Sequence, residues 1–270
     1  MTQTSQPLKI VLLGAGNVAW HLALALEQAG HRVQTIYNRH LHKAQELAVQ
    51  LQQAEATTAS DFSKLKADVF ILTVADQALP EVLQQAVFPE GSLVVHTSGS
   101  HDLSVFSEKQ LINGGVFYPL QTFSKSKPVD FKNVPVCIEA ARETDKQLLQ
   151  QLAQSISNKV AYVTSAERRV LHVAAVFACN FTNHLLGISH DILERSHLDA
   201  TLLHPLIQET VDKATHFPPF SVQTGPAARG DENIIHKHLQ MLQDEPVYRQ
   251  LYYLLSESIH RTQQKQQDKQ

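Results

Sequence analysis

Hydrophobic positions along the chain follow two patterns, which meet near residue 164. Up to that point, short apolar runs alternate with segments in which apolar residues recur every three to four positions. This alternation predicts an α/β fold, in which helices cover both faces of a mostly parallel sheet. The expected strands span residues 8–13, 31–37, 55–58, 67–74, 92–96, 115–118, 134–139 and 159–163. The helices expected between them include residues 17–29, 41–51, 102–110 and 143–156.

After residue 164 the strand pattern stops and only helical periodicity remains. Ser165 is suited to cap a long helix, and apolar residues crowd positions 170–188 more densely than one buried stripe requires. We expect this helix to be buried on most sides, against the first domain and a second subunit, which predicts a homodimer. Further helices are expected over residues 199–216, 231–243 and 246–264. The chain therefore divides into an α/β domain, residues 1–164, and an all-helical domain for substrate binding and dimerisation, residues 165–270.

Composition narrows the class of protein. With 270 residues, 43% of them hydrophobic, the chain is long enough for two globular domains. A net charge of −3 offers no broad basic surface for nucleic acid or an anionic membrane. We find no apolar run that approaches the roughly 18 residues a membrane span needs. Because residues 1–7 also lack the apolar core of a signal peptide, we expect a cytoplasmic protein.

A glycine-rich turn between the first expected strand and helix carries the clearest motif. Residues 14–19 read G-A-G-N-V-A, a form of the dinucleotide-binding pattern G-x-G-x-x-A. Gly14 permits the tight turn, and Gly16 lets the backbone approach a pyrophosphate. The amides of Asn17 and Val18 begin the helix and point toward the phosphates. The next strand closes a βαβ unit of ~30 residues, so we predict a Rossmann-type cofactor domain; a glycine-rich turn in another α/β protein is the alternative.

The end of the second expected strand indicates which nucleotide binds. NAD sites usually place Asp or Glu there for the ribose hydroxyl, whereas NADP sites place an Arg near the additional phosphate. This chain has Asn38 and Arg39 at that point, followed by His40, His42 and Lys43, and no carboxylate. Arg39 can bind a phosphate with two N–H bonds, and Asn38 can donate to the phosphate or the ribose. The pattern favours NADP, while a solvated charged start of the next helix is the alternative.

Polar residues also gather where other expected strands end. Thr73, Val74 and Asp76 follow the fourth strand and are placed to line the cofactor groove, because ligands bind beyond the carboxyl ends of strands in open sheets. Asp76 could equally cap the next helix. Ser98 and Gln121 follow two later strands, where turn formation competes with a role in binding.

The long helix carries polar residues among its apolar ones. His172, Asn183 and His190 fall nearly on one line at 3.6 residues per turn, and Asn180 lies within about a quarter turn of it. Such groups need partners when buried, so they form either structural hydrogen bonds or a ligand face. In a later loop, Arg229 lies between small residues and could bind a substrate carboxylate or a local acid.

A metal site is not expected. The cysteines, Cys137 and Cys179, lack metal-ligand spacing. The pairs His40–His42 and His236–His238 are spaced so that the side chains point apart on a helix, and no third ligand is evident.

Several motifs together resemble one protein family. They are the glycine turn, the loop at residues 96–99, the strand exit at 118–123, Asn180-Phe181 and the loop at 223–231. These look like the family that joins a Rossmann-like domain to the domain of unknown function numbered 2520. The likeness covers nearly the whole chain, and the loop around Arg229 is its most specific part. The family is similar in build to pyrroline-5-carboxylate reductase, ketopantoate reductase and hydroxyisobutyrate dehydrogenase, which implies NADP-linked reduction.

The chain departs at one position from two of those enzymes and at another from many members of its own family. The hydroxyacid and ketopantoate enzymes carry a Lys followed four residues later by an Asn, whereas this chain has His172 followed by Val176. Tyr118 stands where many family members have His. The lysine proton donor is absent, so either His172 replaces it or the chemistry differs.

These observations lead to a hypothesis of function. We expect an NADP(H)-dependent oxidoreductase that transfers hydride to a small carbonyl or imine, with His172 as the proton donor, because histidine titrates near neutral pH. Asn180 and Ser98 would orient the reacting group. The expected substrate-binding residues are Gln121, Asn183 and Arg229. A non-catalytic NADP(H)-binding sensor or scaffold is the alternative, since it needs no proton donor.

Overall fold

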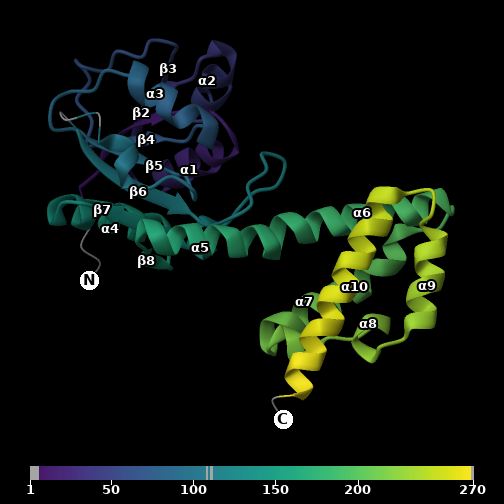
Figure 1. The fold of residues 1–270 in the computed structure, drawn as a ribbon. Helices are drawn as coiled ribbons and strands as arrows, with labels where there is room; N and C mark the ends of the chain where they lie inside the picture. The colour runs from purple at the N-terminus through teal and green to yellow at the C-terminus, as the bar shows by residue number, and fades with distance from the viewer. Residues whose placement is uncertain (1–5, 108, 110–111, 269–270) are drawn as a thin grey trace. The chain divides into compact units, whose positions relative to one another are not determined.

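The computed structural model describes residues 6–107, 109 and 112–268 (Figure 1). Contacts between residues divide the chain into two compact units, one ending at Cys179 and one beginning at Asn180. The change from alternating strands and helices to helices alone comes after residue 164, as the sequence pattern indicates. The first turns of the long helix nevertheless belong with the sheet.

The first unit contains an eight-stranded sheet in the order β3-β2-β1-β4-β5-β6-β7-β8. Every neighbouring pair is parallel except β6 and β7, which are antiparallel. The predicted α/β class with a mostly parallel sheet is confirmed. The strands are β1 Lys9–Leu13, β2 Arg32–Tyr37, β3 Glu55–Thr57, β4 Val69–Leu72, β5 Leu93–His96, β6 Asn113–Pro119, β7 Val136–Ala140 and β8 Val160–Tyr162.

Helices connect these strands, largely at the predicted places. They are α1 Asn17–Gln28, α2 Leu41–Ala48, α3 Leu79–Gln85, α4 Glu143–Ile156 and α5 Ser165–Ala175. Two details differ from the prediction. The expected helix at residues 102–110 is a short 3-10 helix, Leu103–Phe106, and residues 108 and 110 lie outside the described part of the chain. Thr164, and not Ser165, caps α5, because its hydroxyl accepts from Glu167 N while the Glu167 carboxylate accepts from Thr164 N.

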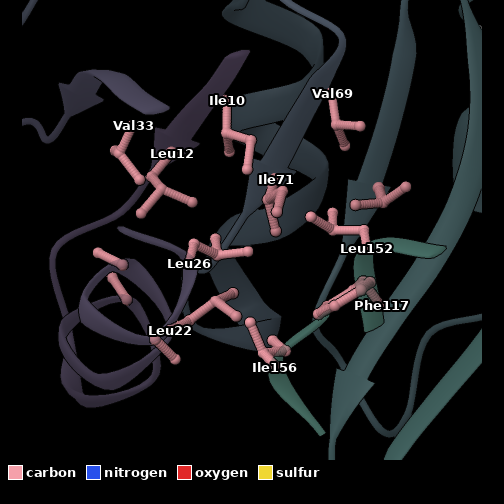
Figure 2. Close-up of a cluster of buried hydrophobic side chains, with 14 of the residues drawn as sticks. Ile10, Leu12, Leu22, Leu26, Val33, Val69, Ile71, Phe117, Leu152 and Ile156 are labelled. Carbon is pink, nitrogen blue, oxygen red and sulfur yellow. The ribbon is translucent and has the colours of Figure 1, made fainter. Parts of the chain in front are cut away.

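Two apolar clusters pack on the two faces of the sheet, as alternating side chains along a strand require. Ile10 and Leu12 of β1 face the larger cluster, to which α1 and α4 contribute; Figure 2 shows Leu22, Leu26, Leu152 and Ile156 among its members. Val11 and Leu13 of β1 face the second cluster, with Phe62, Phe70 and Phe88. This two-sided burial fixes the strand ends on which the site is built.

The second unit is helical throughout its regular structure. A π-helix, Val176–Phe181, leads into α6 Thr182–Arg195, and the later helices are α7 His204–His216, α8 Pro226–Arg229, α9 Glu232–Met241 and α10 Pro246–Gln267. Asp199 caps a short 3-10 helix, Ala200–Leu203, before α7, and Asp231 caps α9 by accepting from Ile234 N at 3.2 Å.

The predicted burial of the long helix is wrong for the single chain. In α5 the only buried residue is Arg168, and among the described residues from Asn180 onward only Ala227 is buried. Large apolar side chains are instead exposed to solvent, among them Val170, Val173 and Leu206. Residues 165–195 also contain an 18-residue window with a mean hydropathy of 1.3, which is long and apolar enough to cross a membrane, a test that core helices of soluble proteins pass as well.

Candidate active site

The glycine turn has the geometry that its sequence predicts. Gly14 adopts φ +124°, a conformation that disfavours every residue with a side chain. A Cβ atom at Gly14 would lie 2.6 Å from Thr73 Oγ1 and 2.7 Å from Thr73 O. The amide of Gly14 donates to Tyr37 O at 2.8 Å. The turn is therefore pressed between the ends of β2 and β4, and only glycine fits there.

The beginning of α1 offers an open cradle of amides. Gly16 is the N-cap and supplies no side-chain cap, and the first turn holds no acidic residue. No atom lies within 4 Å of a Cβ built on Gly16. Asn17 is exposed and Val18 is half-buried. Amides at a helix N-terminus with no competing carboxylate suit an anion, so this cradle fits the pyrophosphate of a dinucleotide.

Thr73 does not line an open groove, contrary to the sequence expectation. Its side chain is buried beneath the glycine turn, and its hydroxyl donates to Leu13 O at 3.2 Å. Its role is to support the turn. Val74, the next residue, is half-buried at the same strand end.

Asn38 and Arg39 lie at the carboxyl end of β2. Asn38 Oδ1 accepts from His40 N at 2.9 Å, which leaves its amide nitrogen as a donor. Arg39 is exposed, and in the described part of the chain its guanidinium forms no ion pair. A cation with no internal partner beside this strand end is suited to a phosphate.

A hydrogen-bond network joins the ends of β4 and β5. Asp76 Oδ2 accepts from Ser100 Oγ at 2.6 Å, and Asp76 does not cap a helix. The hydroxyl oxygen of Ser98 accepts from Ser100 N and His101 N, both at 3.1 Å, and Ser98 is 5% exposed. His101 Nε2 lies 3.0 Å from Asp76 O. Ser98 is thus held by its own loop, which favours the turn role over direct contact with a reacting group.

Gln121 is likewise engaged locally. Its Oε1 accepts from Thr122 N at 2.8 Å, and the side chain is exposed at the exit of β6. The turn alternative accounts for this contact without a ligand.

His172 meets two elements of the sheet at the carboxyl ends of β5 and β6. Its Nδ1 lies 3.1 Å from Tyr118 Oη, and the two rings meet edge to face with centroids 6.2 Å apart. A Cβ atom on Gly99 would lie 2.5 Å from the same Nδ1. The imidazole therefore rests directly on the loop after β5. Burial raises the pKa of Tyr118 to about 12, so this hydroxyl keeps its proton at neutral pH.

A buried ion pair holds α5 to the sheet. Arg168 is fully buried, and its Nη1 donates to Glu139 Oε2 of β7 at 2.6 Å. Arg168 also donates to the backbone oxygen of His101, and Glu139 accepts from Ser165 N and Ser165 Oγ. Because Arg168 and His172 are four residues apart, they share one face of the helix. The ion pair therefore anchors the face that carries His172.

Glu139 and Arg168 were not among the residues predicted from the sequence. The sequence does contain a signal for Glu139, because a carboxylate inside the apolar strand Val136–Ala140 indicates a buried charge. A buried charge needs a partner, but nothing in the sequence shows which cation, 29 residues away, supplies it.

The predicted polar residues of the second unit are surface residues there. Asn180, Asn183 and Arg229 are exposed in that unit. The expected line through His172, Asn183 and His190 assumed 3.6 residues per turn throughout. The π-helix Val176–Phe181 interrupts that period, so the line does not hold. The described residues contain no group of three or more potential metal ligands.

The fold and the glycine turn define the class: a Rossmann-type dinucleotide-binding protein. Residues 9–99 match the family model of NADP oxidoreductases described as coenzyme F420-dependent, and residues 134–259 match the domain of unknown function DUF2520. The protein BF3122 from Bacteroides fragilis, provisionally described as an NADP oxidoreductase, is 42% identical; the match covers 94% of this chain and 98% of that one, with a TM-score of 0.87. The chain therefore belongs to this family of NADP oxidoreductases. The predicted resemblance and the cofactor NADP are confirmed at that level.

More distant structures share the fold. A reductive aminase from Aspergillus terreus, solved with NADPH and ethyl-5-oxohexanoate, is 14% identical with a TM-score of 0.69, over 96% of this chain and 95% of that one. 1-Pyrroline-5-carboxylate reductase from Streptococcus pyogenes is 14% identical with a TM-score of 0.60, over 96% and 100%. Among curated proteins, none matches the chain.

Proposed function

We propose that this oxidoreductase uses NADPH to reduce a small carbonyl or imine. One observation carries the proposal: the open amides at the start of α1 and the imidazole of His172 on α5 both lie at the carboxyl edge of the sheet. Ligands of open α/β sheets bind at this edge. The distant neighbours solved as a reductive aminase and a pyrroline-5-carboxylate reductase act on substrates of the proposed kind.

Each residue has a distinct part in this proposal. The reduced nicotinamide supplies the hydride when bound. The amides of Asn17 and Val18 bind the pyrophosphate, and Arg39 binds the additional phosphate of NADP. His172 donates a proton to the oxygen or nitrogen that gains charge. Asn180 is proposed to orient the reacting group, and Asn183 and Arg229 are proposed to bind the substrate, Arg229 through a carboxylate.

Arg39→Ala is expected to weaken NADPH binding by roughly 10- to 100-fold and to leave NADH binding unchanged, because charge-assisted hydrogen bonds to the phosphate are lost. Isothermal titration calorimetry with both nucleotides measures this. Arg32→Ala is the matched control, since Arg32 is exposed at the opposite end of the same strand. Equal affinity of the unaltered protein for NADPH and NADH would contradict the phosphate role of Arg39.

Turnover separates the reductase from a non-catalytic sensor or scaffold. Purified protein should oxidise NADPH in the presence of a keto acid, a ketone with an amine, or a cyclic imine. The loss of absorbance of the reduced nicotinamide measures this oxidation. His172→Gln should lower turnover while keeping NADPH affinity. Tight NADPH binding without oxidation across this panel would favour the sensor.

We also propose that the apolar surface of the second unit is covered by a second copy of this chain. Leu202, Leu206, Phe220 and Met241 are each more than 60% exposed. A helical unit with one buried residue in its described part lacks a core of its own. A second copy of the chain carries the same apolar surface, so two copies can cover each other in a symmetric dimer. The cytoplasmic location stays a prediction from the sequence.

Light scattering after size exclusion is expected to give twice the mass of the chain. The double variant Leu206→Asp/Phe220→Asp should give the single-chain mass or aggregate. Val49→Asp is the control, because Val49 is 76% exposed in the sheet unit. A monomer at micromolar concentration for the unaltered protein would overturn the proposed dimer.

A further inference from the structure

Tyr118 forms a hydrogen bond with the proposed proton donor, His172. Its hydroxyl and His172 Nδ1 are 3.1 Å apart, and in the described part of the chain each of these two atoms has the other as its hydrogen-bond partner. Among the described residues, His172 Nε2 forms no hydrogen bond. One ring nitrogen is thus engaged by the sheet and the other is left for a ligand.

The direction of this hydrogen bond follows from the chemistry of the phenol. Tyr118 keeps its proton at neutral pH, since burial raises its pKa to about 12. A half-buried O–H needs an acceptor, and within the described part of the chain His172 Nδ1 is its hydrogen-bond partner. When Tyr118 donates to Nδ1, the hydrogen of neutral imidazole must reside on Nε2.

Gly99 makes this arrangement tight. The ring of His172 lies so close to the loop after β5 that a Cβ on residue 99 would come within 2.5 Å of Nδ1 and 2.7 Å of Cγ. The imidazole is therefore held between the Gly99 backbone on one side and the Tyr118 hydroxyl on another. Arg168, one turn earlier on α5, fixes the helix from which it projects.

We propose that Tyr118 is the positioning residue of the reaction: its hydroxyl fixes the His172 ring so that Nε2 carries a hydrogen toward the substrate whether His172 is neutral or protonated. In the protonated state, Nδ1–H donates to Tyr118 Oη, whose own hydrogen turns away. Transfer of the Nε2 proton to the substrate oxygen or nitrogen then leaves neutral imidazole with its hydrogen on Nδ1, still bonded to Tyr118. The proposal rests on the function proposed for His172, and third groups that orient a catalytic base or acid are a general feature of such sites.

Nuclear magnetic resonance of ¹⁵N-histidine protein with NADPH bound tests the positioning role without any substrate. Long-range proton–nitrogen spectra distinguish the two neutral tautomers of a histidine. The signals that disappear in His172→Gln are those of His172. We expect the Nε2–H form alone in the unaltered protein and a mixture of both forms in Tyr118→Phe. Tyr162→Phe is the matched control, because Tyr162 lies exposed on β8 beside Lys146.

Kinetics supply the second measurement. Tyr118→Phe is expected to lower kcat by roughly 10- to 100-fold, to change KM by less than about threefold and to alter the pH profile of kcat. An unchanged tautomer together with unchanged kcat in Tyr118→Phe would overturn the positioning role while leaving His172 as donor. If no substrate is turned over, the proposed function fails, and the spectra still decide whether Tyr118 sets the tautomer.

Discussion

Replacing Arg168 by methionine is expected to lower the free energy of unfolding of the sheet unit by about 3–5 kcal/mol. The substitution keeps the length of the side chain but leaves Glu139, 7% exposed, as a buried carboxylate without its cation. The backbone oxygen of His101 also loses a donor. The loss is larger than the strength of the ion pair itself, because most of it is the cost of an uncompensated buried charge.

The adjacent residue supplies the control for this prediction. Arg169 forms an ion pair with Asp102 at 3.2 Å, but about half of its side chain is exposed. Arg169→Met is therefore expected to cost less than about 1 kcal/mol. Denaturant unfolding can be followed through Trp20, the single tryptophan, which lies on α1 in the same unit. Similar losses for Arg168→Met and Arg169→Met would contradict the anchoring role of the buried pair.

Stability is expected to fall as the pH drops below about 6.5, and His96 should be a principal cause. Burial lowers the pKa of His96 to about 3, aided by the nearby positive charges of Arg168 and His101. The unfolded chain takes up this proton near pH 6.5, whereas the folded chain does not until about pH 3. Between those values the unfolded state binds more protons, so His96 removes up to about 1.4 kcal/mol of stability per pH unit. Burial lowers the pKa of His31 as well, which acts in the same direction.

His96→Asn tests the contribution of this residue. Asparagine can still accept from Ser98 N, as His96 Nδ1 does at 3.1 Å, but it does not titrate. The variant should be less stable at neutral pH, since His96 stacks on Phe106. Its unfolding free energy should nevertheless fall by about 2 kcal/mol less between pH 7 and pH 5. Above pH 7.5 the difference between the two proteins should stay constant. Parallel curves down to pH 5 would rule out His96 as the titrating group.

Much of the fold and the cofactor end of the site could be predicted from the sequence because the signals are local. Gly14 and Gly16 are separated by one residue, and each strand or helix is indicated by the spacing of apolar residues within a short segment. Arg39 could be proposed because it follows the second strand of the βαβ unit, where NADP sites place an Arg; its phosphate role stays a prediction.

The rest depends on contacts between distant parts of the chain. The pairing of Glu139 with Arg168, and of Tyr118 with His172 across 54 residues, is set by how α5 crosses the sheet. The prediction that residues 170–188 are buried was wrong for the single chain. An apolar sequence indicates that a surface needs to be covered, but it does not show which part of the chain or which partner covers it. The π-helix was missed since no rule based on 3.6 residues per turn reveals it.

The register of the sheet determines where α5 begins. Glu139 of β7 lies opposite Val116 of β6, which is level with the last residues of β5, β4 and β1, namely His96, Leu72 and Leu13. Because Ser165 donates to Glu139, α5 starts level with the carboxyl ends of these strands. The seven-residue rise from Ser165 to His172, ~10 Å, then brings the imidazole to Tyr118, two residues further along β6. The inverted strand pair β6–β7 thus places the first turns of a connecting helix beside the loops that follow the parallel strands.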